Sequence, residues 1–453
     1  MSTIVMASVP IYGHVAPMIG LAGQLIERGH RVRFVTGGRF APQVAAIGAE
    51  FIALPADADF DDRLLNAGLD KSVRPDGIAG LRYDVTNTFL RPGRAQYDAL
   101  ASTMSEPLAA VVVDPTFVGA ALLAAAPKAT RPPVIVAGVL PLTLDSDYVP
   151  PFGLGLSPLR SGAGGLDRAR NRVLRLLVQR GVFGPVQREY DVLFSSVVGR
   201  RAPSFVMNWV SGADAIIQFS VPAFEYPRPD ATVPIRFAGP MIRSTAHELP
   251  SWWRGLDSSR PLVLVTQGTI ANHDLDELIR PTVSALAGSE VQLVVTTGGP
   301  PVSQLGALPS NVRAAEFLPY DQLFPRVDAF VTNGGYGGVH FALANGVPSV
   351  VAGAGEDKPE VAARVAWSGV GVNLRTGRPR PADIAQAVRR VLDEPAYRRA
   401  AGAAARQISE ADGVDALLDE IERLRSHPAG TAQRHRRSQG SQARTQFEHQ
   451  GRS

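Results

Sequence analysis

A histidine lies directly after the first apolar stretch of the chain, where it could accept a proton. Residues 3–9 are apolar, Pro10 and Gly13 interrupt them, and His14 follows. An unperturbed imidazole has a pKa of about 6.5, so it is mostly neutral at pH 7 and able to act as a general base. Gly13 would let the backbone approach a ligand closely. A packed or capping histidine fits the same position, and spacing alone leaves both interpretations open.

Asp114 is the second candidate, because it ends the apolar run 110–113. If this run forms a strand parallel to residues 3–9, Asp114 and His14 follow strands that end at the same sheet edge. A carboxylate there could accept a hydrogen bond from the far ring nitrogen of His14 and stabilise the imidazolium formed on proton capture. Alternatively, Asp114 caps a helix that begins near Thr116.

A glycine-rich segment, residues 332–339, could bind a phosphate. It follows the predicted strand 329–331 and opens a predicted helix. Its glycines are Gly334, Gly335, Gly337 and Gly338. Backbone N–H groups at a helix N-terminus attract anions, so the segment fits a diphosphate. Many glycine-rich turns are purely structural, however.

Two more loops place polar residues after predicted strands. Gln267, Gly268 and Thr269 follow the strand 262–266 and could add donors to the same phosphates. The strand 349–351 leads to a loop that contains Glu356, Asp357 and Lys358. Its carboxylates could bind sugar hydroxyls, or they could form a charged first turn favoured by the dipole of the following helix.

Several other chemistries are disfavoured. The chain has no cysteine, which excludes disulfides, thiolate metal sites and a cysteine nucleophile. The loop at residues 10–14 lacks the G-x-G-x-x-G pattern of dinucleotide-binding proteins. Asp57 and Asp59 form a D-x-D pattern, which binds a metal ion in some enzymes, but their acidic surroundings favour a solvated loop. We expect no metal site.

The candidate residues follow strands of a repeated α/β pattern. Residues 3–9, 31–36 and 50–54 are predicted strands that alternate with helices over 16–28 and 40–47. The pattern resumes before residue 137 and again after residue 261. Alternating strands and helices predict parallel sheets with right-handed crossovers. We therefore expect an α/β fold of two doubly wound, Rossmann-like domains. Their ligands should bind in a cleft at the carboxyl ends of the strands.

Composition divides the chain into five predicted parts. We expect an N-terminal domain over 1–240, a linker over 241–259 and a C-terminal domain over 260–408. A helix over 409–426 is predicted to pack back on the first domain, and residues 427–453 to form a disordered tail. The tail holds five arginines and one glutamate, which accounts for the net charge of +4. This charge therefore does not predict a nucleic-acid partner.

No targeting or membrane segment is expected. Residues 1–9 lack the basic start of a signal peptide, and no apolar run approaches 18 residues. We expect a cytoplasmic protein without stable membrane insertion, as a monomer or weak homodimer.

Residues 317–374 resemble the donor-binding signature of the UDP-glycosyltransferase family, the large inverting group with the GT-B fold. The motifs that carry the resemblance are residues 317–319, 332–338, 346–348, 356–358 and 369–371. Residues 13–17 and 28–30 also match the opening of the family. The resemblance extends to about Arg425 and is strongest to bacterial macrolide and natural-product glycosyltransferases.

The resemblance implies that the domain over 1–240 binds the acceptor and that the domain over 260–408 binds the nucleotide sugar. It also implies a role for each candidate. His14 matches the general base of the family and Asp114 its orienting partner. Phe317 falls where an aromatic ring covers the nucleobase, and Asp357 matches the acid that binds sugar hydroxyls. The implied donor site consists of Gly13, Gln267, Gly268, Thr269, Phe317, Leu318, Asn333, Gly334, Gly335, Gly337, Gly338, Glu356, Asp357 and Lys358.

Four positions depart from the family pattern. Asn333 replaces a usual histidine, Gly338 a serine or threonine, Phe341 a ribose-binding glutamate, and Lys358 a glutamine. These departures leave the donor open: we expect UDP-glucose, with a dTDP-deoxysugar of antibiotic biosynthesis as the alternative.

The expected reaction is metal-independent, inverting transfer of a sugar to an apolar acceptor such as a polyketide, macrolide, steroid or phenolic. The nucleotide sugar is a co-substrate, and no other cofactor is expected. The loops between residues 60 and 97 and between 141 and 166 are expected to shape the acceptor site. The alternatives are a sugar-nucleotide 2-epimerase and a non-catalytic sugar-nucleotide-binding protein.

Overall fold

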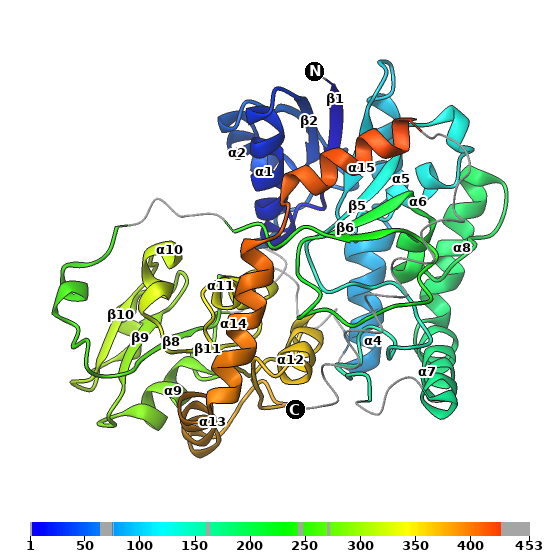
Figure 1. The fold of residues 1–453 in the computed structure, drawn as a ribbon. Coiled ribbons are helices and arrows are strands. Elements are labelled where there is room, and N and C mark those ends of the chain that lie inside the picture. The colour runs from blue at the N-terminus through cyan, green and yellow to red at the C-terminus, as the bar shows by residue number, and fades with distance from the viewer. Residues whose placement is uncertain are drawn as a thin grey trace.

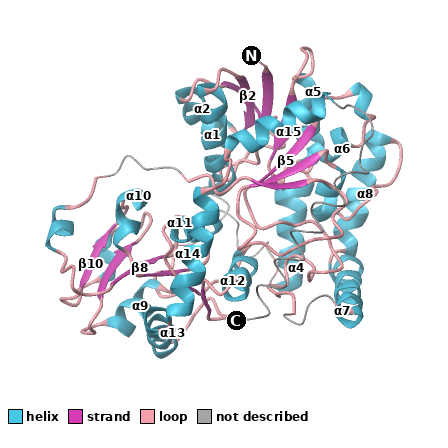
Figure 2. Ribbon diagram, viewed as in Figure 1, coloured by secondary structure: helices cyan, strands magenta, loops and turns pink. Residues whose placement is uncertain are grey.

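The computed structural model describes residues 2–63, 75, 77–159, 164–242, 248–269 and 272–426. Figures 1 and 2 show two separate groups of strands, each flanked by helices. Within the described ranges, no helix is long and apolar enough to cross a membrane. The tail predicted over residues 427–453 lies outside the described residues.

The first sheet has seven described parallel strands in the order β3-β2-β1-β4-β5-β6-β7. These strands are β1 (Thr3–Ala7), β2 (Arg31–Thr36), β3 (Glu50–Ala53), β4 (Ala110–Val113), β5 (Val134–Gly138), β6 (Ala215–Gln218) and β7 (Ile235–Phe237). Strand β1 pairs with β4 so that Ala7 lies opposite Val113. The chain segments that follow these two strands therefore leave the sheet side by side.

The helices of this half are α1 (Tyr12–Glu27), α2 (Ala41–Ala46), α4 (Gly77–Asp84), α5 (Gly93–Ser102), α6 (Gly119–Ala124), α7 (Gly165–Leu176) and α8 (Gly184–Val198). They cover both faces of the sheet, where two apolar clusters form. Every residue of β4, β5 and β6 is buried, as expected for central parallel strands covered on both faces.

The second sheet has six described parallel strands in the order β10-β9-β8-β11-β12-β13. They are β8 (Leu262–Thr266), β9 (Gln292–Thr296), β10 (Val312–Ala315), β11 (Ala329–Thr332), β12 (Ser349–Val351) and β13 (Gly371–Asn373). The helices of this half are α9 (Ile279–Leu286), α10 (Tyr320–Leu323), α11 (Tyr336–Ala344), α12 (Lys358–Trp367), α13 (Pro381–Asp393) and α14 (Pro395–Ser409). Thr266 pairs with Thr332 and Val331 with Val350, so the loops after β8, β11 and β12 share one edge.

The last described helix, α15 (Val414–Ser426), belongs to the first half in space. Figure 1 shows it lying across the blue N-terminal half. Val414, Leu417 and Ile421 join the apolar cluster around β1. The Gly413 N–H donates to the Ala238 carbonyl at 3.0 Å. The chain thus passes between the halves twice, and the two passages touch.

The halves also meet through a buried ionic cluster of Glu225, Arg228, Glu360 and Arg364. The Arg364 guanidinium bonds both oxygens of Glu225, from the segment after β6, and one oxygen of Glu360, from α12. Arg228 adds a second cation against Glu225 at 3.1 Å. Burial alone would raise the pKa of Glu225, but the charges of Arg364 and Arg228 outweigh it and lower that pKa to about 2.

We expect Arg364→Leu to destabilise the protein strongly, because it leaves Glu360 buried without a cation and Glu225 with only Arg228. Removing one partner of a buried pair costs about 3–5 kcal/mol. The free energy of unfolding in urea measures this loss. Arg380→Leu breaks an exposed pair with Asp383 and should change the free energy of unfolding little, because solvent screens such a pair. Equal losses in the two variants would contradict the role assigned to Arg364.

Two element predictions are wrong. Helix α1 begins at Tyr12 rather than residue 16, because a carboxylate oxygen of Asp62, 50 residues away, accepts the Tyr12 N–H at 2.8 Å. Much of the stretch between residues 60 and 97, predicted as an acceptor-shaping loop, is helical, in α4, a π-helical turn (Val85–Leu90) and α5. The polar and glycine-rich sequence there obscures the helical period.

Candidate active site

His14 and Asp114 lie in hydrogen-bond contact at the carboxyl edge of the first sheet. His14 is in the first turn of α1, and Asp114 directly follows β4. The distance from His14 Nδ1 to Asp114 Oδ1 is 3.2 Å, and the Thr116 hydroxyl lies 3.2 Å from the same nitrogen. Asp114 is fully buried, whereas His14 retains some exposure. An ionised carboxylate accepts only, so Nδ1 carries the proton and Nε2 is left as the basic nitrogen.

The surroundings of His14 and Asp114 shift the pKa of each side chain. Burial alone would lower the pKa of His14, but the hydrogen bond and charge of Asp114, with the charges of Asp357 and Glu356, outweigh it and raise that pKa above its ordinary value. Burial alone would raise the pKa of Asp114, but His14, Thr116 and the Val9 N–H hold it below the usual range. Asp114 therefore stays ionised and stabilises an imidazolium.

Asp114 makes the predicted contact with His14, but it does not cap a helix at Thr116, because α6 begins only at Gly119. Its Oδ1 accepts the Thr116 N–H at 2.8 Å, which caps the turn leading to α6. Its Oδ2 accepts the Val9 N–H at 2.8 Å, from the segment after β1. These backbone bonds fix the carboxylate, so the contact with His14 is preorganised. Thr116 was missed as a site residue; the Asp-Pro-Thr sequence is the signal that could have suggested it.

Gly13 lies beside His14 in the first turn of α1 and is exposed. No described atom lies within 4 Å of the position that a Cβ would take there. The space beside its Cα is therefore open, as the predicted approach of a ligand requires.

The glycine-rich segment forms the entrance to α11. Gly334 has φ of +93°, and Gly335 precedes the first helical residue, Tyr336. Within the described chain, no side chain caps this helix. No described atom lies within 4 Å of the Cβ positions of Gly335 and Gly337, and Gly338 meets only the Phe330 ring at 3.7 Å. The first turn of α11 is thus open beside these glycines, which gives an anion room to approach its N-terminus.

We expect Gly334→Ala to destabilise the fold. Its positive φ disfavours a side chain, and a Cβ would lie 2.7 Å from Val351 Cγ1. Such strain costs about 1–3 kcal/mol in the free energy of unfolding, measured in urea. Gly335→Ala is the matched control, with an ordinary φ of −59° and open space around it. A larger loss in the control would show that this reading of the turn is wrong.

Asn333 and Gln267 tie the two phosphate loops together. The Asn333 side-chain amide donates to the Gln267 carbonyl. The Gln267 side chain accepts the N–H groups of Leu278 and Ile279 at 3.2 and 3.0 Å and so holds the start of α9. These contacts show both side chains positioning the loops. Gly268 has φ of +73°, its N–H bonds the Thr266 hydroxyl, and Thr269 is exposed beside it.

Glu356, Asp357 and Lys358 lie at the start of α12. Lys358 is buried and pairs with Glu356, whose φ of +56° is unusual for a non-glycine residue. Burial is the main cause that raises the pKa of Asp357, opposed by Lys358 and His14. The charges of His14, in the first half, and Asp357, in the second half, therefore interact across the boundary between the halves. The structure brings the predicted base and the predicted sugar-binding acids to one place.

The predicted nucleobase position follows β10, an edge strand of the second sheet. Phe317 is 43% exposed, whereas the Leu318 side chain is buried in the core. Phe341, at the position of the usual ribose-binding glutamate, packs its ring on Tyr320 and Phe324. A phenyl ring cannot accept a hydrogen bond from a ribose hydroxyl in the way that a glutamate does. Phe341 therefore has a packing role at this position.

The acidic stretch after β3 is built differently from the solvated loop that we expected. Asp62 is buried and holds the Tyr12 N–H, and Asp59 accepts the Gly38 N–H at 2.9 Å, while Asp57 is exposed. A search of the described residues finds no group of three or more His, Asp or Glu side chains able to hold a metal ion.

Two family models match the chain. Residues 5–137 match the glycosyltransferase family 28 N-terminal domain. Residues 281–415 match the erythromycin biosynthesis protein CIII-like C-terminal domain. The two matches fall on the two sheets described above.

Curated relatives align over nearly the whole chain. The 4′-demethylrebeccamycin synthase of Lentzea aerocolonigenes is 40% identical, over 93% of this chain and 99% of its own. UDP-glycosyltransferase 2 of Phaeomoniella chlamydospora is 34% identical, over 93% and 95%. UDP-glucosyltransferase B1 of Starmerella bombicola is 31% identical, over 93% and 98%.

Solved structures confirm the predicted fold class. The glycotransferase of kitacinnamycin aligns with a TM-score of 0.68 at 23% identity, over 93% of this chain and 98% of its own. The calicheamicin glycosyltransferase CalG4 aligns with a TM-score of 0.66 at 24% identity, over 95% and 100%.

Proposed function

The chain belongs to the UDP-glycosyltransferase family, among the glycosyltransferases of natural-product biosynthesis with the GT-B fold, and from that premise we propose that it transfers a hexose from a nucleoside diphosphate to a hydroxyl of an apolar small molecule, with inversion at the anomeric carbon. One observation carries this proposal. His14, held by Asp114, lies close enough to Asp357 and Glu356 for their charges to help raise its pKa. The proposed base and the proposed sugar-binding acids are therefore near neighbours.

In the proposed reaction, Nε2 of His14 accepts the acceptor hydroxyl proton while the oxygen forms its bond to the anomeric carbon. The bond from that carbon to the diphosphate oxygen breaks, and the electron pair leaves with the diphosphate. Asp114 stabilises the resulting imidazolium. One displacement without an enzyme nucleophile inverts the anomeric centre.

The leaving diphosphate is proposed to bind at the open first turn of α11. Preorganised N–H groups and the helix dipole stabilise the charge that develops there. Lys358 begins α12 beside this loop: its Cβ lies 3.7 Å from the position of a Cβ on Gly334. Its ammonium has three donor hydrogens, and pairing with Glu356 leaves donors for a phosphate oxygen. The proposal needs no metal ion.

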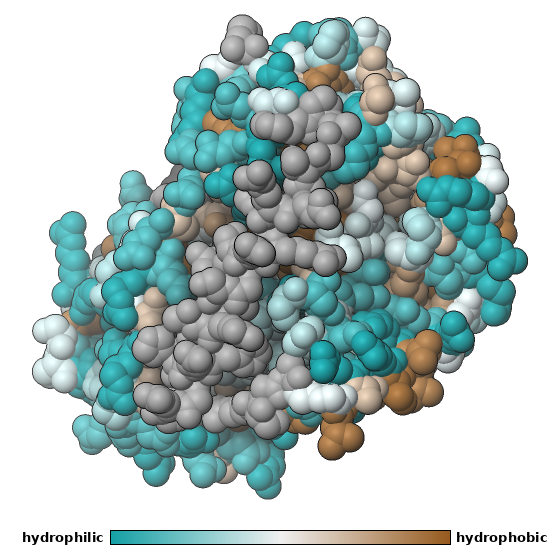
Figure 3. Space-filling view, turned by 45° about the vertical axis from the view of Figure 1, so that its right-hand side comes forward, coloured by the Kyte–Doolittle hydropathy of each residue, from teal (hydrophilic) through white to brown (hydrophobic). Residues whose placement is uncertain are grey.

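We propose UDP-glucose as the donor, since relatives that align over nearly their full length are named UDP-glycosyltransferase and UDP-glucosyltransferase. A dTDP-deoxysugar is the alternative donor. For the acceptor, the loop after β5 exposes Leu154, Leu156 and Leu159. Figure 3 shows hydrophobic side chains, in brown, along the lower right edge of the face that it draws. These side chains favour an apolar acceptor.

The test is a donor and acceptor screen by mass spectrometry, run in EDTA. UDP-glucose and dTDP-sugars are each combined with phenolic, steroid and macrolide acceptors. The expected result is one hexose added to an acceptor, with the linkage inverted relative to the donor by NMR. Conversion of the donor without an acceptor would instead indicate an epimerase. A strict need for Mg²⁺ or Mn²⁺ would contradict the metal-free step, and donor binding without any conversion would indicate a non-catalytic protein.

A further inference from the structure

The loop after β5 is fastened to helix α12 of the other half by one carboxylate. Oε1 of Glu360, in the first turn of α12, accepts the N–H groups of Gly153 and Gly155 at 2.9 and 2.8 Å. Glu360 is 3% exposed. Hydrogen bonds to a buried charged acceptor are stronger than neutral ones, so this contact fixes the loop firmly.

The backbone of the loop is shaped for this contact. Gly153 and Gly155 have φ of +99° and +59°, which side chains rarely adopt and which aim both N–H groups at one oxygen. A Cβ on Gly155 would lie 2.8 Å from the Pro359 Cβ and 3.2 Å from the Pro359 carbonyl. The loop therefore packs directly on the start of α12.

Glu360 is itself held in place from its other side. Its Oε2 accepts a hydrogen bond from Arg364 at 3.0 Å, and Arg364 is bound to Glu225. The carboxylate lies one helical turn from Asp357 and Glu356, the acids proposed to bind the donor sugar. Any movement of the loop relative to these acids must break or stretch the bonds to Glu360.

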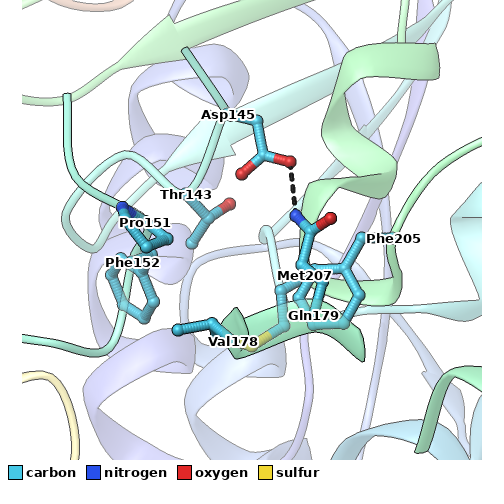
Figure 4. A pocket seen from close by; sticks show the side chains of 8 residues that line it. All are labelled: Thr143, Asp145, Pro151, Phe152, Val178, Gln179, Phe205 and Met207. Carbon is cyan, nitrogen blue, oxygen red and sulfur yellow. Dashed lines mark hydrogen bonds between the residues drawn. The ribbon is translucent and has the colours of Figure 1, made fainter. Parts of the chain in front are cut away.

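The same loop forms one wall of a hollow in the first half. Pro151 and Phe152 face Val178, Phe205 and Met207 across it. Figure 4 shows Asp145 at its edge, with a carboxylate oxygen that accepts the Gln179 amide at 2.7 Å. Phe152 is the residue next to Gly153, so this apolar wall ends where the contact with Glu360 begins.

We propose that Glu360 is a positioning residue. It holds residues 151–155, on the acceptor side, in a fixed position relative to Glu356 and Asp357, the acids proposed to bind the donor sugar. The inference rests on the proposed function, since it assigns the loop after β5 to the acceptor side of the site. It follows that the acceptor KM depends on Glu360 although this side chain faces the loop and not the hollow, while nucleotide affinity does not depend on it.

The test compares Glu360→Ala and Gly155→Ala, which disturb the contact from its two sides. Each is expected to raise the acceptor KM about tenfold or more, because at least one hydrogen bond to a charged group is lost or strained. The Kd of UDP, measured by calorimetry, should stay within about twofold. Amide hydrogen exchange at residues 153–155 should lose protection in Glu360→Ala. Glu360→Gln keeps an oxygen that can accept both N–H groups and should restore most of the acceptor KM.

Two controls separate positioning from general loss of structure. Gly212→Ala adds a methyl where no described atom lies within 4 Å and should leave the acceptor KM unchanged. Arg364→Leu removes the ion pair but keeps the loop contact, so its acceptor KM should rise less than that of Glu360→Ala. Lost protection in Glu360→Ala with an unchanged acceptor KM would overturn the inference. Absence of transfer by the unaltered protein would overturn the proposed function instead. The exchange data would still show whether Glu360 holds the loop at residues 153–155.

Discussion

His14→Ala is expected to lower kcat by about 10²–10⁴-fold, the usual contribution of a positioned general base. The variant leaves the acceptor hydroxyl without a proton acceptor, because Asp114 is fully buried behind the imidazole and bonded to Thr116 and Val9. The donor loops on the second sheet do not contain His14, so UDP affinity should stay within about twofold. Steady-state kinetics and calorimetric UDP binding measure the two quantities.

The matched control for this variant is His273→Ala. His273 is exposed, and its replacement should change neither kcat nor the free energy of unfolding by a measurable amount. Turnover in His14→Ala equal to that of the unaltered protein would rule out His14 as the base. A large fall in UDP affinity would show instead that His14 acts on donor binding.

Asp114→Asn is expected to change the pH profile in a defined direction. A base must be neutral to act, so kcat/KM falls as the pH drops through the pKa of His14. That pKa is raised in the unaltered protein, because Asp114, Asp357 and Glu356 outweigh the lowering effect of burial. In the variant, the charge and ionic hydrogen bond of Asp114 are lost and burial remains. The acidic limb should therefore move to lower pH.

The same variant should also lose rate on the high-pH plateau. An asparagine no longer fixes the Nδ1–H tautomer or stabilises the imidazolium, and a comparable change in a serine protease triad costs about 10⁴-fold. We expect a loss of about 10²–10⁴-fold in kcat, with a limb at lower pH. Asp98→Asn, in an exposed pair with Arg94, serves as the control and should alter neither. A limb that stays in place or moves to higher pH would contradict the pairing of Asp114 with His14.

Much of the site could be predicted because its chemistry lies at strand ends. In a parallel sheet, all strands run in the same direction, so the loops that follow them share one edge. Apolar runs in the sequence reveal the strands. This is why His14 and Asp114, 100 residues apart, could be placed together from the sequence. The loops after β8, β11 and β12 could be grouped for the same reason. Two doubly wound halves were also predictable, since both show the same alternation.

What could not be predicted depends on contacts between distant segments. The start of α1 is set by Asp62, and the orientation of Gln267 by the N–H groups at the start of α9. Neither contact joins residues at the short sequence spacings that helix and strand patterns reveal. Glu360 looked like an ordinary acid in the first turn of a helix, where the dipole favours it. Its partners Gly153 and Gly155 come from the other half of the chain.

The return of α15 to the first sheet bears on how these enzymes can be recombined. The acceptor half is not a continuous block of sequence, since Val414, Leu417 and Ile421 complete its core. A chimera that exchanges acceptor specificity between relatives must carry residues 414–426 together with residues 2–238. A single crossover near residue 240 would pair one parent's sheet with the other parent's helix. Two crossovers, at the two touching passages, keep each core intact.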